Sequence, residues 1–259
     1  MTRLFVIAFL CAPGLTAQSK FSSPMIGMAR DGHQQLRVVH GVPGTFIWRD
    51  AIGIKASDWA FDGSGGLVKT ATELLTVAAD GAIISRRPAP QRETVLGPQS
   101  AFFPDTAELW LVGLKGETKV PLDLEAVAGS VIALGPARAH SLQLAACRAD
   151  ALWLLVIDTR SGKITHEMAA GGMLAQACRL DGSKRLVLLS NRLVLATPQA
   201  VVVQTTAGIE RTIPVSGSRA VRAGNEWIAI ENGCAPSKLI RLSSDSEKSY
   251  QLPAVKEPL

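Results

Sequence analysis

A short polar turn recurs six times along the chain, and this recurrence limits the possible folds more than any other feature. Each time, a run of small or apolar residues ends at an anchoring Asp or Asn and resumes after a brief turn. The anchors are Asp31, Asp62, Asp105, Asp150, Asp181 and Asn225. Their spacings of 31, 43, 45, 31 and 44 residues fall in the range of about 20 to 50 residues that is typical of repeat architectures. The sequence therefore predicts stacked repeats, and a pattern of strands and turns by itself names no substrate.

The apolar runs that follow the anchors resemble β-strands. Residues 109–112, 152–157 and 227–230 are short, rich in Val, Leu, Ile and Trp, and bounded by Gly, Asp, Ser or Asn, which favours strands over helices. A second set of turns follows at 80–81, 115–116, 158–162 and 207–208, where Gly supplies the positive φ of tight hairpins. Each repeat is therefore expected to hold three or four strands.

The repeat length predicts the architecture. The mean spacing of about 39 residues matches one four-stranded blade, and six such blades need about 234 residues. We predict an all-β fold, a β-propeller of about six blades with three to four antiparallel strands each. Residues 25–30 are expected to complete the ring, because closure removes exposed sheet edges.

Residues 1–17 have the layout of a secretory signal peptide. A basic start at Arg3 precedes an apolar core over 4–10, a Pro13-Gly14 break and small residues that end at Ala17. The core is too short to span a bilayer, which takes roughly 20 apolar residues. We expect a signal peptide over 1–17, a single propeller domain over 18–259, no membrane span and a secreted or periplasmic location.

The segment 152–164, Leu-Trp-Leu-Leu-Val-Ile-Asp-Thr-Arg-Ser-Gly-Lys-Ile, resembles a blade of the YVTN and NHL class of secreted bacterial propellers. In those proteins a hydrophobic strand leads into an Asp-Thr-x-x-Gly-Lys turn. The resemblance is letter-specific only here and names no subfamily. It implies a ring of blades with a binding surface, in families that include non-catalytic scaffolds and a few hydrolases and lyases.

Four arginines are the candidate ligand-binding residues, because each lies near the predicted end of a repeat's first strand. Converging on a central channel, they could grip a carboxylate, phosphate or sulfate group through paired donors. The alternative is that each pairs with a nearby acid, as Arg30 with Asp31 or Arg148 with Asp150, and has a structural role. The four are Arg30, Arg148, Arg179 and Arg222.

No motif in the sequence predicts catalysis or metal binding. The four histidines are scattered without ligand spacing, and neither a nucleophile elbow nor a calcium loop is present. Three of the five tryptophans of the mature chain, Trp110, Trp153 and Trp227, follow their anchors closely and are expected to pack between blades rather than form a sugar-stacking platform. We therefore assign no catalytic residue, no metal ligand and no cofactor.

Three cysteines remain after cleavage, Cys147, Cys178 and Cys234. Cys147 and Cys178 are each preceded by Ala and followed by Arg, which suggests equivalent positions in neighbouring repeats. Such positions usually lie beyond the roughly 7 Å Cα limit for a disulfide. Free buried thiols are expected, although an exported protein could pair two of the three.

The net charge of +5 is a mild surplus and is spread along the chain, so nucleic acid is not an expected partner. The densest basic cluster of the chain is interpreted as a connecting loop; it consists of Arg86, Arg87 and Arg92. The sequence predicts an exported, non-catalytic binding or scaffolding propeller whose ligand is an unknown protein or an anionic glycan. The protein is expected to be a monomer. The alternative is a hydrolase or lyase whose active site lies at the mouth of the central channel.

Overall fold

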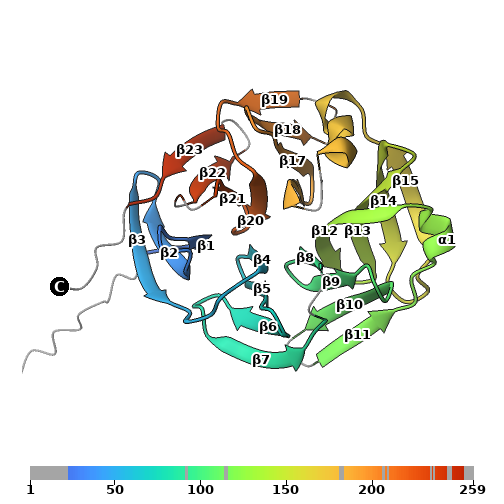
Figure 1. The fold of residues 1–259 in the computed structure, drawn as a ribbon, viewed down its shortest axis with the longest axis horizontal. Coiled ribbons are helices and arrows are strands. Elements are labelled where there is room, and N and C mark those ends of the chain that lie inside the picture. The colour runs from blue at the N-terminus through green and yellow to red at the C-terminus, as the bar shows by residue number, and fades with distance from the viewer. Residues whose placement is uncertain are drawn as a thin grey trace, which may run out of the picture.

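The protein is a ring of six β-sheets around a central axis (Figure 1). The computed structural model describes residues 23–90, 93–113, 116–180, 184–205, 208, 210–233, 235, 237–243 and 247–253. Blades A to F follow one another along the chain, and each is a contiguous antiparallel sheet. The predicted six-bladed β-propeller is confirmed, with three strands in blade A and four in each other blade.

Blades A to C occupy the first half of the described chain. Their strands are β1 (Met25–Arg30), β2 (Leu36–Val42) and β3 (Thr45–Ala51) in blade A, β4 (Asp58–Asp62), β5 (Gly65–Lys69), β6 (Glu73–Ala78) and β7 (Ile83–Pro88) in blade B, and β8 (Val95–Gly97), β9 (Ser100–Phe103), β10 (Glu108–Gly113) and β11 (Gly116–Val120) in blade C.

Blades D to F complete the ring. Their strands are β12 (Ser130–Arg138), β13 (Ser141–Arg148), β14 (Ala151–Asp158) and β15 (Ile164–Ala169) in blade D, β16 (Leu186–Leu188), β17 (Arg192–Ala196), β18 (Val201–Thr205) and β19 (Glu210–Ile213) in blade E, and β20 (Arg219–Arg222), β21 (Trp227–Glu231), β22 (Lys238–Leu242) and β23 (Glu247–Gln251) in blade F.

The turn residues form the hairpins that the sequence predicts. Between β14 and β15, Asp158 Oδ1 accepts hydrogen bonds from the backbone N–H groups of Arg160 and Ser161, and Gly162 has φ +71°. The six anchors, however, do not share one position. Asp62 and Asn225 follow innermost strands, whereas Asp105 and Asp150 follow the second strands of their blades. Asp181 lies outside the described residues.

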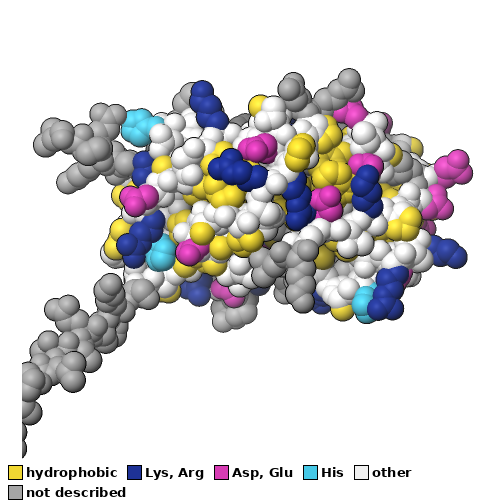
Figure 2. Space-filling view, turned by 90° about the horizontal axis from the view of Figure 1, so that it is seen from below, with side chains coloured by type: hydrophobic (Ala, Val, Ile, Leu, Met, Phe, Trp, Pro, Cys, Tyr) yellow, Lys and Arg dark blue, Asp and Glu magenta, His cyan; other side chains and the backbone are white. Residues whose placement is uncertain are grey.

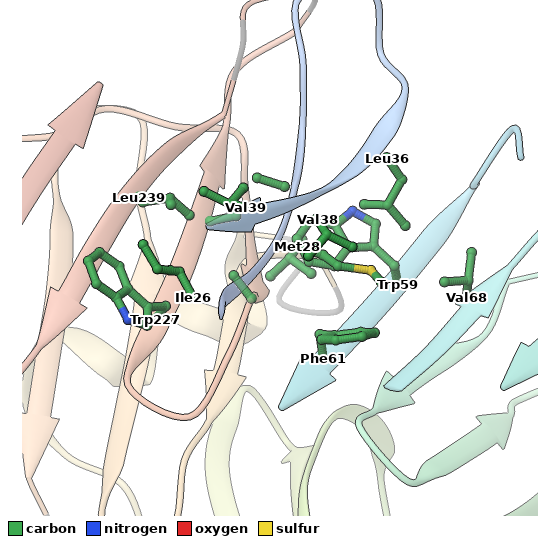
Figure 3. Packing of buried hydrophobic residues seen from close by; sticks show 14 of the residues in the cluster. Ile26, Met28, Leu36, Val38, Val39, Trp59, Phe61, Val68, Trp227 and Leu239 are labelled. Carbon is green, nitrogen blue, oxygen red and sulfur yellow. The ribbon is translucent and has the colours of Figure 1, made fainter. Parts of the chain in front are cut away.

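Each sheet buries its faces against its neighbours, as a propeller requires. One apolar cluster joins blades A, B and F and includes Met28, Trp59 and Trp227, and Figure 3 shows Met28 packed beside Val38 and Trp59. Further clusters join blades E and F, C and D, D and E, and B and C. The core is therefore distributed among the junctions between blades.

Two predictions about side chains near the surface need correction or refinement. Arg86 and Arg87 belong to the outermost strand β7, where they pair with Glu73 and Glu117, so they do not lie in a loop. Arg92 lies outside the described residues. Packing between blades is confirmed for Trp227, which is 8% exposed, and for Trp110 and Trp153, which are partly buried against the clusters of blades B and C and of blades C and D. Of the other two, Trp59 is 1% exposed and Trp48 is partly buried, both at the cluster that joins blades A, B and F.

Blade A differs from the other five because its strands begin one position further from the axis. β1 packs against β21, the second strand of blade F, while β20 and β4, the innermost strands of blades F and B, contact each other directly. Figure 1 shows β1 outside the pair formed by β20 and β4. Among the described residues, blade A has no strand at the innermost position. Residues 25–30 therefore close the ring as part of their own blade and add no strand to blade F.

The junction between blades F and A is closed by backbone contact. The Met28 N–H donates to the carbonyl oxygen of Ala223 at 2.9 Å, and the Ser237 N–H donates to the carbonyl oxygen of Arg30 at 3.0 Å. Gly27 has φ +154°, and a Cβ there would lie 1.7 Å from the Ala223 oxygen. Only glycine permits this approach.

The described part of the chain contains two short helices, α1 (Leu124–Val127) and the 3-10 helix η1 (Gly172–Arg179), and no helix there is long and apolar enough to cross a membrane. η1 lies between blades D and E, where Leu174 and Ala177 are buried.

Cys178, in η1, forms a disulfide with Cys147, at a Cα separation of 5.6 Å. The expectation of free thiols at these two positions is wrong, because Cys178 belongs to a helix inserted between two blades and is not the blade-to-blade equivalent of Cys147. Cys234 lies outside the described residues.

Candidate functional site

The central channel is narrow and is lined from five blades. A cavity of about 30 Å³ is surrounded by residues in or next to the innermost strands of these blades, which are β4, β8, β12, β16 and β20. This volume is about that of one water molecule in the liquid. Among the described residues, none of blade A lines the cavity, consistent with its position further from the axis. The channel as it stands can admit a water molecule or an ion, but not a larger ligand.

At the end of the channel where β4 and β20 begin, two acids and two arginines form a buried network. Arg219 donates to Asp58 and forms an ion pair with Glu231 at 3.3 Å. Arg30 pairs with the same Glu231 carboxylate at 3.5 Å and donates to the Ala56 carbonyl oxygen at 2.6 Å. The side chains of Arg30, Arg219 and Glu231 are 13%, 14% and 8% exposed. The network joins blades A, B and F at the closing junction.

Burial shifts the pKa values of two members of this network, Asp58 and Arg30. Loss of solvent raises the pKa of Asp58, and the opposing attraction of Arg219 does not restore it to its ordinary value. Burial lowers the pKa of Arg30, although Glu231 acts in the opposite direction. Trp59 Nε1 adds a hydrogen bond to Glu231 at 3.3 Å. Buried acids with perturbed pKa values can be catalytic or structural, and here every charged group has an opposite charge beside it.

The opposite end of the channel carries Arg222. This residue is 8% exposed, and its Nε donates to the Gly224 carbonyl oxygen at 3.4 Å. Its Nη1 is buried and makes no hydrogen bond within the described part of the chain. Burial lowers the pKa of Arg222, against the attraction of Asp62. An enclosed guanidinium with a free donor can receive an anion or a water molecule.

The structure does not bring the four candidate arginines together. Arg222 alone lines the channel cavity, and Arg30 lies in the closing network. Arg148 ends β13, where it donates to the carbonyl oxygens of Ala126 and Val127 and pairs with Glu167 at 2.9 Å. Arg179 is exposed at the end of η1.

The acids that pair with these arginines also differ from the expected ones. Arg30 and Arg148 pair with Glu231 and Glu167 rather than with Asp31 and Asp150, whereas Asp31 binds Arg37 Nε at 2.5 Å. A ligand role for any of the four arginines remains a prediction.

A larger hollow lies between blades D and E. Residues of β13, β14 and β15 form one wall, and β16, β17 and their connecting turn form the other, around a cavity of about 280 Å³. The lining residues are mainly aliphatic, and the polar ones among them are Gln143, His166, Ser190 and Arg192. The Arg192 guanidinium itself donates to the Ser243 carbonyl oxygen of blade F. Preformed, mostly apolar concave sites with a few polar groups are typical of ligand-binding pockets. We call this hollow the D/E cleft.

Neither the charged network at the end of the channel nor the D/E cleft could be found by sequence motifs. Asp58, Arg219 and Glu231 come from blades B and F, which are far apart in the chain and adjacent only in the ring. Arg192 follows an ordinary strand turn, so nothing in its neighbours indicates a cleft. Within the described residues, no group of three or more His, Cys, Asp or Glu side chains is placed to hold a metal ion.

The outer surface visible in Figure 2 mixes charges of both signs. Lys and Arg side chains lie among Asp and Glu side chains, with apolar patches between them. Such a surface gives no extended single-sign field on this side of the ring.

No known protein family and no curated protein matches the sequence. Among solved structures, the chain is similar to PorZ, a surface component of the type-IX secretion system of Porphyromonas gingivalis, at 10% identity and TM-score 0.49, over 91% of this chain and 38% of that one. It is also similar to a streptogramin B lyase at 12% identity and TM-score 0.41, over 90% and 85% of the two chains. A virginiamycin B lyase from Staphylococcus aureus matches at 14% identity and TM-score 0.40, over 89% and 85%. The chain spans less than two thirds of PorZ, and at these identities the likeness concerns the fold alone.

Proposed function

We propose that this protein is an exported, non-catalytic binding module whose ligand enters the D/E cleft. The observation that carries the proposal is the cleft itself, a preformed hollow of about 280 Å³ with aliphatic walls and a few polar groups. In a channel of about 30 Å³, a ligand would have to displace the packed side chains. We therefore assign the binding surface to a junction between blades rather than to the axis.

Export is supported by two independent features. Residues 1–17 have the composition of a secretory leader, and they lie outside the described residues. The Cys147–Cys178 disulfide suits an oxidising compartment such as the periplasm or the cell exterior. A direct check is the mass of the mature protein after expression in a host that secretes it, which should correspond to a chain beginning at residue 18.

The binding role is tested with a ligand panel and a turnover panel in parallel. The purified protein should be stabilised in thermal melts by at least one small organic molecule, and Met168→Trp, at the rim of the D/E cleft, should remove the stabilisation. Generic esterase, glycosidase and lactonase substrates should give no turnover. Turnover that one point change abolishes would contradict a non-catalytic role.

A second candidate is an enzyme with its site at the channel mouth, and one observation favours it. Asp58 and Glu231 both bind Arg219, and burial raises the pKa of Asp58, an arrangement that also occurs in paired catalytic acids. Asp58→Asn distinguishes the two roles. If Asp58 is structural, the Asp58→Asn substitution changes only the stability of the protein. If Asp58 is catalytic, the substitution lowers turnover while the protein remains folded.

A further inference from the structure

One wall of the D/E cleft is a row of three residues that runs across blade D. Gln143 of β13, Val156 of β14 and His166 of β15 lie opposite one another in register, so their side chains share one face of the sheet. Leu154 pairs with Met168 on the same face, and Leu154 packs in the apolar cluster of blades D and E. The row therefore faces blade E, with a polar side chain at each end and an apolar one between them.

The opposite wall is formed by Leu188 and Leu193 of blade E. They pair in register between β16 and β17, belong to the cluster of blades D and E, and are each 4% exposed. A Cβ at Gly135 of β12 would lie 3.0 Å from the Cβ of Gln143 and 3.4 Å from the Cβ of Leu188. The two walls therefore converge near Gln143, at the inner end of the cleft, while Met168, which is 44% exposed, lies at the outer rim.

The helix η1 stands between the two blades beside this cleft. It packs against β14 of blade D and against β17 and β18 of blade E, with Leu174 and Ala177 buried in the junction. Cys178 ties it covalently to the end of β13. A ligand therefore enters a preformed slot between two sheet faces and does not have to separate the blades.

The cleft offers hydrogen bonds but no permanent charge. Among the described residues that line it there is no Asp, Glu or Lys, and Arg192 directs its guanidinium to the Ser243 carbonyl oxygen of blade F. Within the same part of the chain, the side chains of Gln143 and His166 make no hydrogen bond. A buried ion without a partner is costly, whereas a neutral molecule with an acceptor at each end would satisfy both side chains.

We propose that the D/E cleft binds a flat, uncharged aromatic molecule that accepts a hydrogen bond from Gln143 at one end and from His166 at the other. The inference rests on the proposed binding function and names its ligand class. Two strand spacings, about 10 Å in all, separate these residues, which is roughly the length of a para-substituted benzene ring with its hydrogen bonds. A cleft of about 280 Å³ has room for roughly ten non-hydrogen atoms, judged by the roughly 30 Å³ that a water molecule occupies.

The walls favour a ring over a flexible chain of the same size. A flat ring between two sheet faces has apolar contacts on both of its faces, with Val156 on one side and with Leu188 and Leu193 on the other. The Met168 thioether at the rim adds a favourable contact between sulfur and an aromatic ring.

The test compares three compounds of similar size by calorimetry on the full mature chain. The first, para-methoxyacetophenone, is flat and neutral and has an oxygen at each end. The second, para-methoxybenzoate, has the same ring and the same number of non-hydrogen atoms but is an anion at neutral pH. The third, heptyl methyl ketone, is neutral and flexible.

Four variants accompany the wild type. Gln143→Met and His166→Leu each remove the hydrogen-bonding group at one end of the cleft, and Met168→Trp obstructs its rim. Gln199→Met is the matched control, because it makes the same exchange as Gln143→Met at an exposed turn between β17 and β18, outside the cleft. Thermal melts establish that each variant is folded.

The wild type should bind para-methoxyacetophenone about tenfold or more tightly than para-methoxybenzoate, because the cleft has no partner for a buried carboxylate. It should bind the flexible ketone more weakly than the aromatic one, because the chain loses more rotational freedom. Gln143→Met and His166→Leu should each weaken binding of the aromatic ketone about threefold to tenfold, the usual effect of one neutral hydrogen bond. Met168→Trp should weaken it further, and Gln199→Met should not change it.

The proposal is wrong if the wild type binds para-methoxybenzoate or heptyl methyl ketone as tightly as para-methoxyacetophenone. It is equally wrong if folded Gln143→Met and His166→Leu bind the aromatic ketone as the wild type does, or if the wild type does not bind it at millimolar concentration. If another ligand still stabilises the protein in a manner that Met168→Trp abolishes, the proposed binding function stands and only the ligand class is wrong. If no ligand does so, both are wrong.

Discussion

At the junction of blades F and A, backbone atoms of neighbouring blades touch, and two arginines and two acids fill the remaining space. At the junction of blades D and E, a helix tied down by a disulfide stands between the sheets, and a cleft remains beside it. The first junction joins the first and last blades of the ring, which the chain does not connect directly. The second lies within the chain and does not have to close anything. A ring can therefore leave one junction loosely packed when its closing junction is tightly packed.

The largest expected effect is at the closing junction. Gly27→Ala places a Cβ within 1.7 Å of the Ala223 oxygen, so the blades must separate, and we expect a loss of more than about 4 kcal/mol in the free energy of unfolding. Gly171→Ala, beside η1, meets nothing within 4 Å and should change stability little. Urea unfolding of both variants gives the comparison. Similar losses in the two would mean that the closing junction is no tighter than the D/E junction.

Removing the shared acid of the closing network should have the next largest effect. Glu231→Gln keeps the shape but leaves Arg30 and Arg219 without their common partner, which should cost about 3–5 kcal/mol. Glu167→Gln is the matched control, because its side chain is 50% exposed and pairs with Arg148; it should cost at most about 1 kcal/mol. Chemical denaturation measures both, and equal losses would show that the network is not a closing device.

Loss of the disulfide should loosen only the D/E junction. The double change Cys147→Ser with Cys178→Ser is expected to cost about 2–4 kcal/mol. Hydrogen exchange should accelerate in η1 and in the adjoining edge of blade D, while the amide of Met28 at the closing junction keeps its protection. Faster exchange of the Met28 amide would mean that the two junctions are coupled.

The smallest effect concerns pH. Burial acts to raise the pKa of Asp31, but hydrogen bonds from Arg37, Gln35 and His33 outweigh it and leave the pKa below its ordinary value. The stabilising contribution of Asp31 is therefore present above pH 3.8 and is lost as the pH falls through the lower folded-state value. The free energy of unfolding, measured from neutral to acidic pH, should decline less steeply for Asp31→Asn than for the wild type. Parallel curves would contradict this.

The sequence predicts the architecture well because turn chemistry is local. Gly162 and the acceptor side chain of Asp158 specify their hairpin within a few residues. The mean spacing of the six anchors then predicts six blades. The sequence does not show which strand of its blade each anchor follows, because an Asp can begin either of two turns in a blade. Asp62 and Asp105 therefore look alike in the sequence but follow different strands.

The candidate site was predicted only in part, because its contacts depend on the closed ring. Arg222 was placed in the channel by strand alternation, and it lies there. The partner of Arg30 was not predictable, since Glu231 is separated from it by nearly the whole chain. Cys178 shares its flanking Ala and Arg with Cys147, which suggests equivalent repeat positions, whereas it lies in a 3-10 helix between blades D and E.

The withdrawal of blade A means that the ring has a different symmetry at its hub than at its rim. Among the described residues, five strands surround the axis, while six sheets radiate from it, so five strands set the width of the channel. Supplying blade A with a fourth, axial strand would wedge β4 away from β20 and pull Asp58 from Arg219. A one-strand insertion there would therefore widen the central channel.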